Sequence, residues 1–493
     1  MTGSDSIRSV VIAGAGVVGL SAALGFARAL PGAAVTVIGG PLAPGALADR
    51  LPAMLPATLP VLDRMGVTEA DLVRAGGATH RLADRFSGWR ADNGVWLHGF
   101  GETGAGLGAG AFHQRWLEAR RTGYAAAYHH FSPAAALAEA GRFVHPVPDE
   151  RSLLSRFAYA LRLDPVATAR HLAARAGRSG VVMTAGPVLS IARRPDGGVG
   201  HVHLSDGRTL AADLFIDCSG PLQLLGQADD WSDWSDWSDA LPPDRLLLAA
   251  GPGAPSPLDD YQAGEIGWRA SWPLRDRTLS GLAYVSALTP EARARRIMGP
   301  AGEVAEAVAI RPGRRRSPWR GNVLALGDAA AACGPLGCAG LVVAHANLEL
   351  ALDLLPGRDL PPLLIAEYNR RAVQRADRVR DFLSLHYVAA GRSAGPFWRA
   401  LRRTAPPPAV ALALETFARH GHLPRHEEEL FDKQSWLAVL LGSGLVPAHP
   451  DPMTTGADTA TSHGAMERLR AAVAGLSAPL PVYADYLARI AAA

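Results

Sequence analysis

The stretch RSVVIAGAGVVGLSAALGF, residues 8–26, decides the fold of this chain. It begins with SVVIA at 9–13, a short apolar run rich in β-branched residues, which predicts a buried parallel strand. A glycine pattern, GxGxxG, follows directly, and residues 21–30 predict a helix. This order of strand, glycine turn and helix is typical of dinucleotide binding, because the glycines let the backbone approach a pyrophosphate at the helix N-terminus. We therefore expect a doubly wound, Rossmann-like α/β domain.

The glycine turn also supplies the first candidate cofactor contacts, which are Gly14, Ala15, Gly16 and Gly19. In dinucleotide sites of this kind, an acidic residue about 20 positions further on binds the ribose hydroxyls. The second predicted strand, AAVTVIGG at 33–40, has Gly39 at that position. Either water or another residue covers the ribose, or the affinity for the cofactor is weakened.

Two later segments are expected to return to the same sheet. Residues 198–220, GVGHVHLSDGRTLAADLFIDCSG, predict a hairpin with an Asp-Gly turn, followed by the strand DLFID. Residues 321–344, GNVLALGDAAAACGPLGCAGLVVA, predict a strand, a glycine-rich turn and a helix that begins near Leu341. Gly327 and Asp328 lie at that strand tip, where the acid suits the ribityl or pyrophosphate part of a flavin. Together, the motifs favour FAD over NAD.

Composition excludes several classes of protein. The chain has 493 residues, of which 48% are hydrophobic and 19% charged, as in globular proteins. Its net charge of +3 gives no support to a nucleic-acid partner. The three cysteines, Cys218, Cys333 and Cys338, form neither a disulfide framework nor a zinc motif, so no metal is expected. The N-terminus lacks a signal peptide pattern, and no apolar run is long enough to span a membrane. We expect a cytoplasmic protein with no membrane partner.

With these motifs in place, the chain resembles the flavin-dependent tryptophan halogenase family from about residue 8 to 455. The resemblance rests on several motifs in the same order. They are GGATHRLADRFSGWR (76–90), LHGFG (97–101), DLFIDCSG (213–220), GWRASWPL (267–274), GPLGCAGL (334–341) and WLAVLLGSGLVP (436–447).

The resemblance implies an oxidoreductase that takes reduced FAD from a separate flavin reductase. Members of the family use O2 and chloride or bromide to make hypohalous acid, which a lysine guides to an aromatic ring, usually an indole. A glutamate assists beside that lysine. The resemblance therefore implies a small aromatic substrate, and it leaves a homodimer open.

This chain departs from the family at both reactive positions. The lysine position falls on Arg81, and the glutamate position falls on Gly337. Arginine stays protonated, with a pKa above about 12, so it does not serve as an amine nucleophile. Gly337 carries no carboxylate. Loss of both groups argues against the usual halogenation and leaves monooxygenation or another flavin-dependent oxidation open.

The resemblance also indicates which residues to consider for each role. Arg81 and its neighbour His80 are the candidate catalytic residues. Backbone N–H groups at Ala339 and Gly340 are candidates for holding the cofactor or an anion. The candidate substrate contacts are Trp268, Trp272 and His98.

Two hypotheses for the function follow. The first is an FAD-dependent oxidative enzyme that uses reduced flavin and O2 for monooxygenation or halogenation of an aromatic or indole-like substrate. The second is a non-catalytic relative that serves as a binding or assembly partner in a biosynthetic pathway. The changes at Gly39, Arg81 and Gly337 are evidence of drift under both.

For domain organisation, we expect an FAD-binding domain over residues 1–355. Substrate-side segments are expected at about 51–149 and 226–319, inserted into that domain. A C-terminal helical region, 356–493, is expected to pack on the substrate side.

One stretch stands apart from these motifs: ADDWSDWSDWSDALPP, residues 228–243, repeats Trp-Ser-Asp three times. The last unit continues into the element DWSDALPPDR, which family members also carry in similar form. The two preceding units resemble in-frame duplications, which predicts a lengthened surface loop. Deletion of residues 231–236 is then expected to leave folding little changed.

Overall fold

The computed structural model describes residues 6–104, 111–195, 197–226, 233–299, 306–449, 451 and 459–492. The chain forms two compact units, each assembled from three separate stretches of sequence. Unit 1 comprises Met1–Ala78, Arg162–Asp244 and Val308–Arg380, and unit 2 comprises Thr79–Leu161, Arg245–Ala307 and Asp381–Ala493. The boundaries of the two units differ from those predicted for the substrate-side segments and the C-terminal helical region. The predicted division by function therefore stays a prediction.

Unit 1 contains the predicted doubly wound sheet, with strand order β19-β20-β11-β1-β2-β7. All neighbouring pairs run parallel except β19 and β20, which form an antiparallel hairpin. The return of the two later segments to the same sheet is confirmed, because β11 pairs with β1 and β20 pairs with β11. The strands are β1 (Ser9–Ala13), β2 (Ala34–Gly39), β7 (Val182–Ala185), β11 (Leu214–Asp217), β19 (Trp319–Arg320) and β20 (Val323–Ala325).

The first helix, α1 (Val17–Ala29), begins four residues before the predicted start. The Leu20 N–H donates to the Gly16 carbonyl at 3.0 Å, which closes a helical turn directly after the glycine pattern. The Val18 N–H donates at 2.8 Å to the carboxylate of Asp49, a residue far along the chain. Because this cap comes from a distant segment, sequence patterns near the helix do not reveal where it starts.

Helices cover the sheet of unit 1, and α9 (Ala339–Asp353) is buried over almost its whole length. Among the described residues, one stretch, Leu336–Asp353, is apolar and long enough to cross a membrane, but 83% of it is buried inside the protein. The other helical elements are α2 (Leu47–Arg50), η1 (Pro56–Thr58), α3 (Val61–Met65), α4 (Glu69–Arg74), α7 (Pro165–Arg178), η4 (Gly220–Leu222), η6 (Gly327–Ala329) and η7 (Leu336–Cys338). The long α10 (Pro362–Ala389) begins in unit 1.

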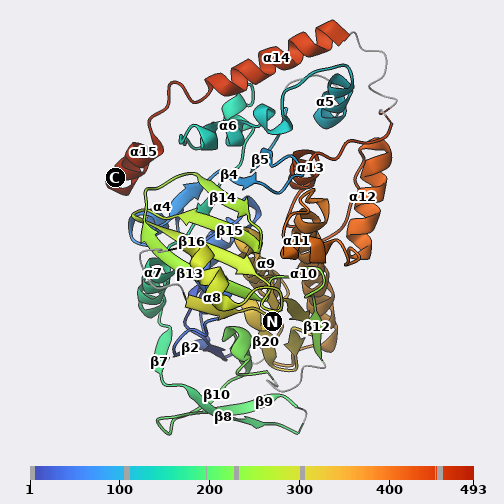
Figure 1. The fold of residues 1–493 in the computed structure, drawn as a ribbon. Helices are drawn as coiled ribbons and strands as arrows, with labels where there is room; N and C mark the ends of the chain where they lie inside the picture. The colour runs from blue at the N-terminus through green and yellow to red at the C-terminus, as the bar shows by residue number, and fades with distance from the viewer. Residues whose placement is uncertain are drawn as a thin grey trace. The chain divides into compact units, whose positions relative to one another are not determined.

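The predicted Asp-Gly hairpin is also confirmed. It belongs to a three-stranded antiparallel sheet of β8 (Val188–Arg193), β9 (Val199–Leu204) and β10 (Thr209–Ala211). This sheet follows directly after β7 and lies at the lower edge of Figure 1. Its apolar face packs with the sheet residues Val11, Ile38 and Phe215 in one core cluster.

Unit 2 is built on a seven-stranded sheet with the order β17-β13-β16-β15-β14-β4-β5. Neighbouring strands with a known register run antiparallel, except for the parallel pair β14 and β4. The strands are β4 (Ala83–Ser87), β5 (Val95–Gly99), β13 (Arg245–Pro252), β14 (Leu258–Ala263), β15 (Gly267–Pro273), β16 (Arg277–Tyr284) and β17 (Glu306–Ala309). A separate two-stranded sheet joins β3 (Thr79–Arg81) and β6 (Ala160–Arg162).

Aromatic side chains fill the core of unit 2. Phe86 stacks on Trp96 with ring centroids 4.2 Å apart, and it stacks on Tyr261 at 5.1 Å. Trp89 meets Trp398 edge-on at 5.2 Å. The helical elements of this unit are α5 (Phe112–Arg121), η2 (Tyr128–Phe131), α6 (Pro133–Glu139), η3 (Leu153–Ser155), α8 (Glu291–Met298), α11 (Pro396–Leu401), α12 (Pro408–His420), α13 (Lys433–Gly442), α14 (Thr459–Gly475) and α15 (Tyr483–Ala492).

The expected surface loop is wrong for the second unit of the tryptophan repeat. Trp234 begins β12 (Trp234–Asp236), which pairs with β18 (Gly313–Arg315), and β18 also pairs with β21 (Ala331–Ala332). Trp234 and Trp237 are buried, with 8% and 2% of their surface exposed. Trp231 lies outside the described residues. A repeat that resembles duplicated loop sequence therefore contributes a strand and two core side chains.

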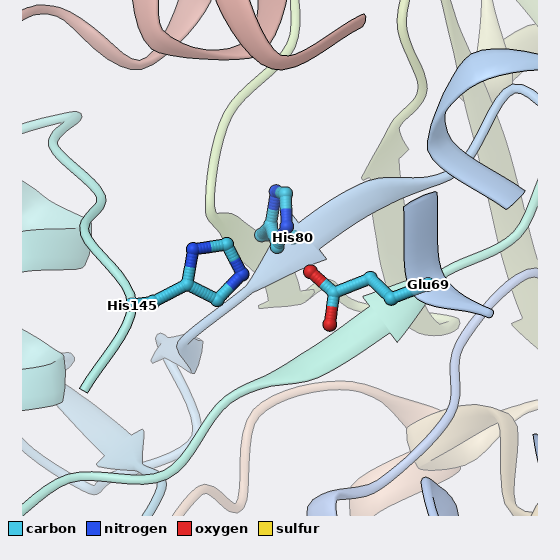
Figure 2. Close-up of side chains that lie close together, drawn as sticks. All are labelled: Glu69, His80 and His145. Atoms are coloured by element: carbon cyan, nitrogen blue, oxygen red, sulfur yellow. The ribbon is translucent and has the colours of Figure 1, made fainter. Parts of the chain in front are cut away.

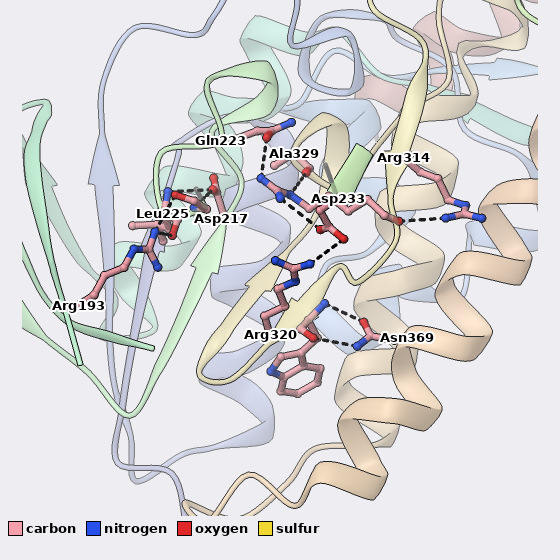
Figure 3. A network of polar contacts seen from close by, with 12 residues as sticks. Arg193, Asp217, Gln223, Leu225, Asp233, Arg314, Arg320, Ala329 and Asn369 are labelled. Carbon is pink, nitrogen blue, oxygen red and sulfur yellow. Dashed lines mark hydrogen bonds and ion pairs between the residues drawn. The ribbon is translucent and has the colours of Figure 1, made fainter. Parts of the chain in front are cut away.

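An acidic residue of the repeat is equally integrated. Asp233 is buried and forms ion pairs with Arg315 at 3.4 Å and with Arg320 at 2.9 Å (Figure 3). The Arg315 guanidinium also donates to the Gln223 side chain at 2.6 Å and to the Ala329 carbonyl at 3.1 Å. This network ties the repeat to the segment that follows β20.

Two deletions test this packing, and each removes whole repeat units. Deletion of residues 231–233 regenerates the strand sequence, because Asp230 then precedes Trp234. We expect an apparent free energy of unfolding within about 0.5 kcal/mol of the parent. Deletion of residues 231–236 places Ala228 at the position of Trp234 and Gln227 at that of Asp233, so we expect a loss of about 3 kcal/mol or more. Urea unfolding of the full chain measures both, and equal effects would contradict the packed repeat.

Candidate functional site

The candidate cofactor site is built on the close approach of three backbone segments of unit 1. A Cβ at Gly14 would lie 2.4 Å from the Cys218 carbonyl oxygen, and a Cβ at Gly19 would lie 2.0 Å from the Gly14 carbonyl oxygen. Gly14 also has a φ of +114°, which L side chains rarely adopt. No larger residue fits at either position, so the glycine pattern has a steric cause in this fold.

A cavity of about 140 Å³ opens beside this turn. Gly14, Ala15 and Gly39 line it, together with Cys218 from the end of β11. Burial raises the pKa of the Cys218 thiol well above its ordinary value, and the nearby carboxylates of Asp49 and Asp217 raise it further. The predicted residues of the first two strands therefore meet at one cavity, at the carboxyl ends of parallel strands where dinucleotides bind.

The second part of the site is formed by the short helix α2, which sequence patterns do not single out. Its Ala48 N–H donates to the Asp328 carboxylate at 2.7 Å, and its Asp49 carboxylate accepts from Val18 in α1. A Cβ at Gly16 would lie 2.3 Å from the Asp49 carboxylate. Thus Asp49 occupies the space next to the second glycine of the pattern.

Asp49 and Asp328 form a buried pair of acids. Burial is the main cause that raises the pKa of Asp49 to about 6 and that of Asp328 to about 7. For Asp328, the charge of Asp49 raises the pKa further. Within the described ranges, no basic side chain forms an ion pair with either acid. The site thus contains two buried acids, whereas a simple anion-binding pocket presents positive charge or free N–H groups.

The other predicted cofactor residues lie close to α2. Gly327 begins η6, with a φ of +63° that suits glycine, and it brings Asp328 toward the Ala48 N–H. Ala339 and Gly340 form the first turn of α9, and a Cβ at Gly340 would lie 3.4 Å from the Ala48 backbone nitrogen. The structure thus brings the predicted cofactor residues together around α2.

These residues fit part of an FAD molecule. The glycine turn, the cavity and the free N–H groups of α1 suit the adenosine and pyrophosphate half. The carboxylate of Asp49, however, stands at the helix N-terminus where a pyrophosphate is expected. Asp49 therefore occupies a donor that a pyrophosphate would use.

Arg81, the residue at the lysine position, is fully buried in unit 2 between two carboxylates. Its guanidinium approaches Asp84 at 2.5 Å and Asp259 at 2.6 Å. It also lies over the ring of Phe100, with the guanidinium carbon 4.8 Å from the ring centroid. Two acids offset the positive charge, so Arg81 is a structural ion-pair centre as well as a candidate catalytic residue. Asp84 lies three residues beyond Arg81, whereas no local signal identifies Asp259 as a partner.

The candidate histidines occupy buried positions in unit 2. His98 lies 3.9 Å from Asp84, and burial lowers its pKa to about 3, so the ring is neutral at ordinary pH. The His80 backbone N–H donates to the Tyr483 hydroxyl at 2.5 Å, and its ring stacks on Phe143 at 4.1 Å. Figure 2 shows the imidazole of His145 beside that of His80, at a centroid distance of 5.2 Å. His80 thus lies in an aromatic cluster, and its catalytic role stays a prediction.

Trp268 and Trp272, the candidate substrate contacts, have no exposed surface. The Trp268 indole N–H donates to the Tyr387 hydroxyl at 3.1 Å, and the Trp272 indole N–H donates to the Tyr261 hydroxyl at 3.2 Å. Both rings therefore belong to the aromatic core of unit 2. A contact with substrate stays a prediction for both.

The backbone at the glutamate position is unusual. Gly337 has a φ of +65°, and its neighbour Cys338 has a φ of +53°. A glutamate at position 337 in this conformation would carry a backbone strain of roughly 1 to 2 kcal/mol. The glycine is therefore suited to the local chain path, whatever chemistry the site performs.

Comparisons with known proteins cover nearly the whole chain. A tryptophan halogenase family model matches residues 9–459. The tryptophan 6-halogenase SttH of Streptomyces toxytricini is 28% identical over 351 residues, which span 68% of this chain and 66% of SttH. The tryptophan 7-halogenase KtzQ of Kutzneria sp. is 25% identical over 508 residues, or 91% of each chain. The structure of BrvH, a flavin-dependent halogenase from Brevundimonas sp. BAL3, superposes with a TM-score of 0.91 at 32% identity, covering 98% of this chain and 99% of BrvH.

The first prediction from this site concerns Arg81. Arg81→Ala leaves two carboxylates buried without their partner, so we expect a loss of about 3 to 5 kcal/mol in the free energy of unfolding. Arg85→Ala is the matched control, because Arg85 pairs with Asp260 at 2.8 Å but is 41% exposed. We expect the control to lose about 1 kcal/mol or less from its ion pair. Chemical denaturation compares the two, and similar losses would refute the buried ion-pair centre.

The second prediction concerns Asp328. Its folded-state pKa of about 7 lies above the ordinary 3.8, so the folded protein binds a proton that the unfolded chain releases between these pH values. Stability from this group is therefore lost as pH rises from about 4 to 7. Asp328→Asn removes the buried charge but keeps an acceptor for Ala48.

We expect the stability of Asp328→Asn to exceed that of the parent by about 2 to 4 kcal/mol more at pH 8 than at pH 4.5. Asp359→Asn, an exposed acid of the same unit, is the control and should show no such trend. Unfolding midpoints across this pH range measure the difference. A gap between Asp328→Asn and the parent that does not change with pH contradicts the burial of a charged carboxylate.

Proposed function

The chain belongs to the tryptophan halogenase family, and from this premise we propose that it is an FAD-dependent enzyme that oxidises an aromatic, indole-like substrate. In this proposal, a separate flavin reductase supplies the reduced cofactor. The observation that carries it is the glycine turn and the cavity of unit 1, in a chain whose resemblance places Arg81 and Gly337 at the family's lysine and glutamate positions.

Unit 1 would hold the cofactor through its backbone. The turn from Gly14 to Gly16 and the N-terminus of α1 would bind the pyrophosphate, and the cavity beside Gly39 would take the adenosine. Asp328 at the tip of β20 would bind the ribityl chain. When bound in its reduced form, FAD supplies the electrons that activate O2. The N–H groups of Ala339 and Gly340 would hold an anion such as chloride or bromide.

The role of Arg81 decides which oxidation is favoured. In the halogenases that this chain resembles, a lysine guides hypohalous acid to the ring. Arg81 is instead neutralised by Asp84 and Asp259, and Gly337 provides no carboxylate. We propose that monooxygenation, or a halogenation that does not use this residue pair, is the activity of the chain.

The substrate class rests on relatives. SttH and KtzQ are named as tryptophan halogenases, and BrvH is named as a flavin-dependent halogenase. We propose a small indole-like or other aromatic substrate on this basis. A homodimer and a cytoplasmic location are part of the same proposal, as is a role in a biosynthetic pathway.

A non-catalytic binding or assembly role is the second candidate. Three observations favour it: the paired state of Arg81, the glycine at 337, and the carboxylate of Asp49 at the helix N-terminus. Such a relative would keep the fold while losing cofactor chemistry. Purified protein would then be colourless and would not take up flavin.

The deciding experiment combines binding with turnover. Titration with FAD and with reduced FAD, followed by flavin absorbance and fluorescence, is expected to show saturable binding. Supplied with FAD, a flavin reductase, NADH, O2, bromide and indole or tryptophan, the protein is expected to give an oxidised product. Its mass distinguishes oxygen insertion from halogenation. Absence of flavin binding refutes the proposed enzyme and favours the non-catalytic role. Saturable binding without an oxidised product contradicts the proposed indole-like substrate.

A further inference from the structure

The inference concerns Asp49, a fully internal acid that caps the most characteristic helix of the fold. Asp49 is only 3% exposed, and its carboxylate accepts the Val18 N–H at 2.8 Å. The first turn of α1 contains no acidic residue, and its N-cap Gly16 has no side chain to satisfy the free N–H groups. A carboxylate from α2, 31 residues further on, therefore supplies the negative charge that this helix end attracts.

This position matches the one that a bound pyrophosphate requires. The glycine pattern leaves Gly16 without a Cβ, and a Cβ there would lie 2.3 Å from the Asp49 carboxylate. In a cofactor complex, the space beside the second glycine and the first N–H groups of the helix serve the phosphate oxygens. Asp49 and a pyrophosphate are both anions that need the same donors, so they do not occupy the helix end together.

The surroundings of Asp49 favour its release. Burial raises the pKa of this carboxyl to about 6, which means that its charged form is held at a cost in free energy. The nearby titratable groups are the carboxyl of Asp328 and the thiol of Cys218, and neither offers a positive charge. In the part of the chain that the structure describes, Asp49 forms no ion pair with a basic residue. Movement toward solvent would restore its hydration.

The polar contact that the structure shows for the Asp49 side chain is the hydrogen bond from Val18. Helix α2 has only four residues, and its N-cap Ala46 provides no side-chain hydrogen bond. Its contacts to α1 and η6 include two hydrogen bonds, one from Val18 to Asp49 and one from Ala48 to Asp328. Release of the Asp49 side chain therefore breaks a single hydrogen bond at α1 and leaves the bond between Ala48 and Asp328 intact.

We propose that Asp49 is an internal substitute for the cofactor pyrophosphate, and that FAD binds by exchanging its pyrophosphate for this carboxylate at the N-terminus of α1. This inference rests on the proposed function, because it requires that FAD is the ligand of unit 1. It assigns to Asp49 control over cofactor affinity. Without ligand, the Val18 N–H at the start of α1 already has an acceptor in Asp49. The favourable free energy of pyrophosphate binding is therefore reduced by the loss of this hydrogen bond.

The test compares Asp49→Asn with the unmodified protein. Asparagine keeps an acceptor for the Val18 N–H but removes the charge that competes with phosphate. We expect the dissociation constant for FAD at pH 8, measured by flavin fluorescence, to fall at least tenfold in Asp49→Asn. Asp359→Asn removes an exposed acid from the same unit and is expected to change the constant less than twofold.

ADP and adenosine separate the pyrophosphate from the rest of the cofactor. In the unmodified protein, exchange predicts that ADP binds no more than about threefold more tightly than adenosine, because the pyrophosphate displaces an existing anion. In Asp49→Asn, ADP is expected to gain at least tenfold while adenosine is unchanged. Competition with a fluorescent adenine nucleotide measures these constants. The comparison in the unmodified protein holds even if the variant fails to fold.

Each outcome has a definite meaning. If the unmodified protein binds FAD and Asp49→Asn binds it equally or less tightly, the exchange is wrong and the proposed function stands. If ADP binds the unmodified protein a hundredfold more tightly than adenosine, the exchange is also wrong. If Asp49→Asn alone binds FAD, Asp49 excludes the cofactor from the unmodified protein, and both the exchange and the proposed enzyme are wrong. If neither protein binds FAD, ADP or adenosine, the exchange and the proposed cofactor both fail.

Discussion

The contact on which the rest of unit 1 depends is the approach of the Gly19 backbone to the Gly14 carbonyl oxygen. A single added methyl group at Gly19 would lie 2.0 Å from that oxygen, so α1 and β1 meet at a distance that only glycine permits. This distance sets the path of α1 across the sheet, and α1 then packs against other helices of the unit. The same turn brings β1 to the end of β11, where Gly14 approaches the Cys218 carbonyl. The cavity, the buried acids and the first turn of α1 take their positions from this junction.

The elements that sequence patterns predicted well are those whose signals are local. The strand SVVIA, the Asp-Gly hairpin and the strand before Gly327 each combine a short apolar run with a turn residue, and the structure confirms them. The start of α1 was predicted too late because its cap, Asp49, lies in another segment. The repeat was misjudged for a similar reason: Trp234 is buried by its pairing with β18, about 80 residues away, and a repeated sequence contains no sign of that partner.

The ion pairs of the candidate site were also beyond prediction from local sequence patterns. Arg81 was identified from its place in a motif, but its state depends on Asp259, which lies on a strand far along the chain. Ion pairs of this kind depend on tertiary structure, and no spacing rule predicts them. The predicted cofactor residues and the predicted substrate residues also differ in how clearly the sequence identifies them. The cofactor residues lie on backbone turns that a glycine pattern makes recognisable. Trp268 and Trp272 are buried aromatic side chains, a type that serves equally well in a hydrophobic core or as a substrate contact.

The thiol of Cys218 has a consequence for a protein that handles reactive oxygen or halogen species. Only the thiolate reacts readily with peroxides and hypohalous acids, and the thiol of a buried cysteine with a raised pKa stays protonated. Cys218 lines the cavity next to the glycine turn. Two carboxylates near its sulfur therefore do more than complicate anion binding. Burial, together with these two carboxylates, keeps the thiol protonated, which is the form that reacts slowly with oxidants.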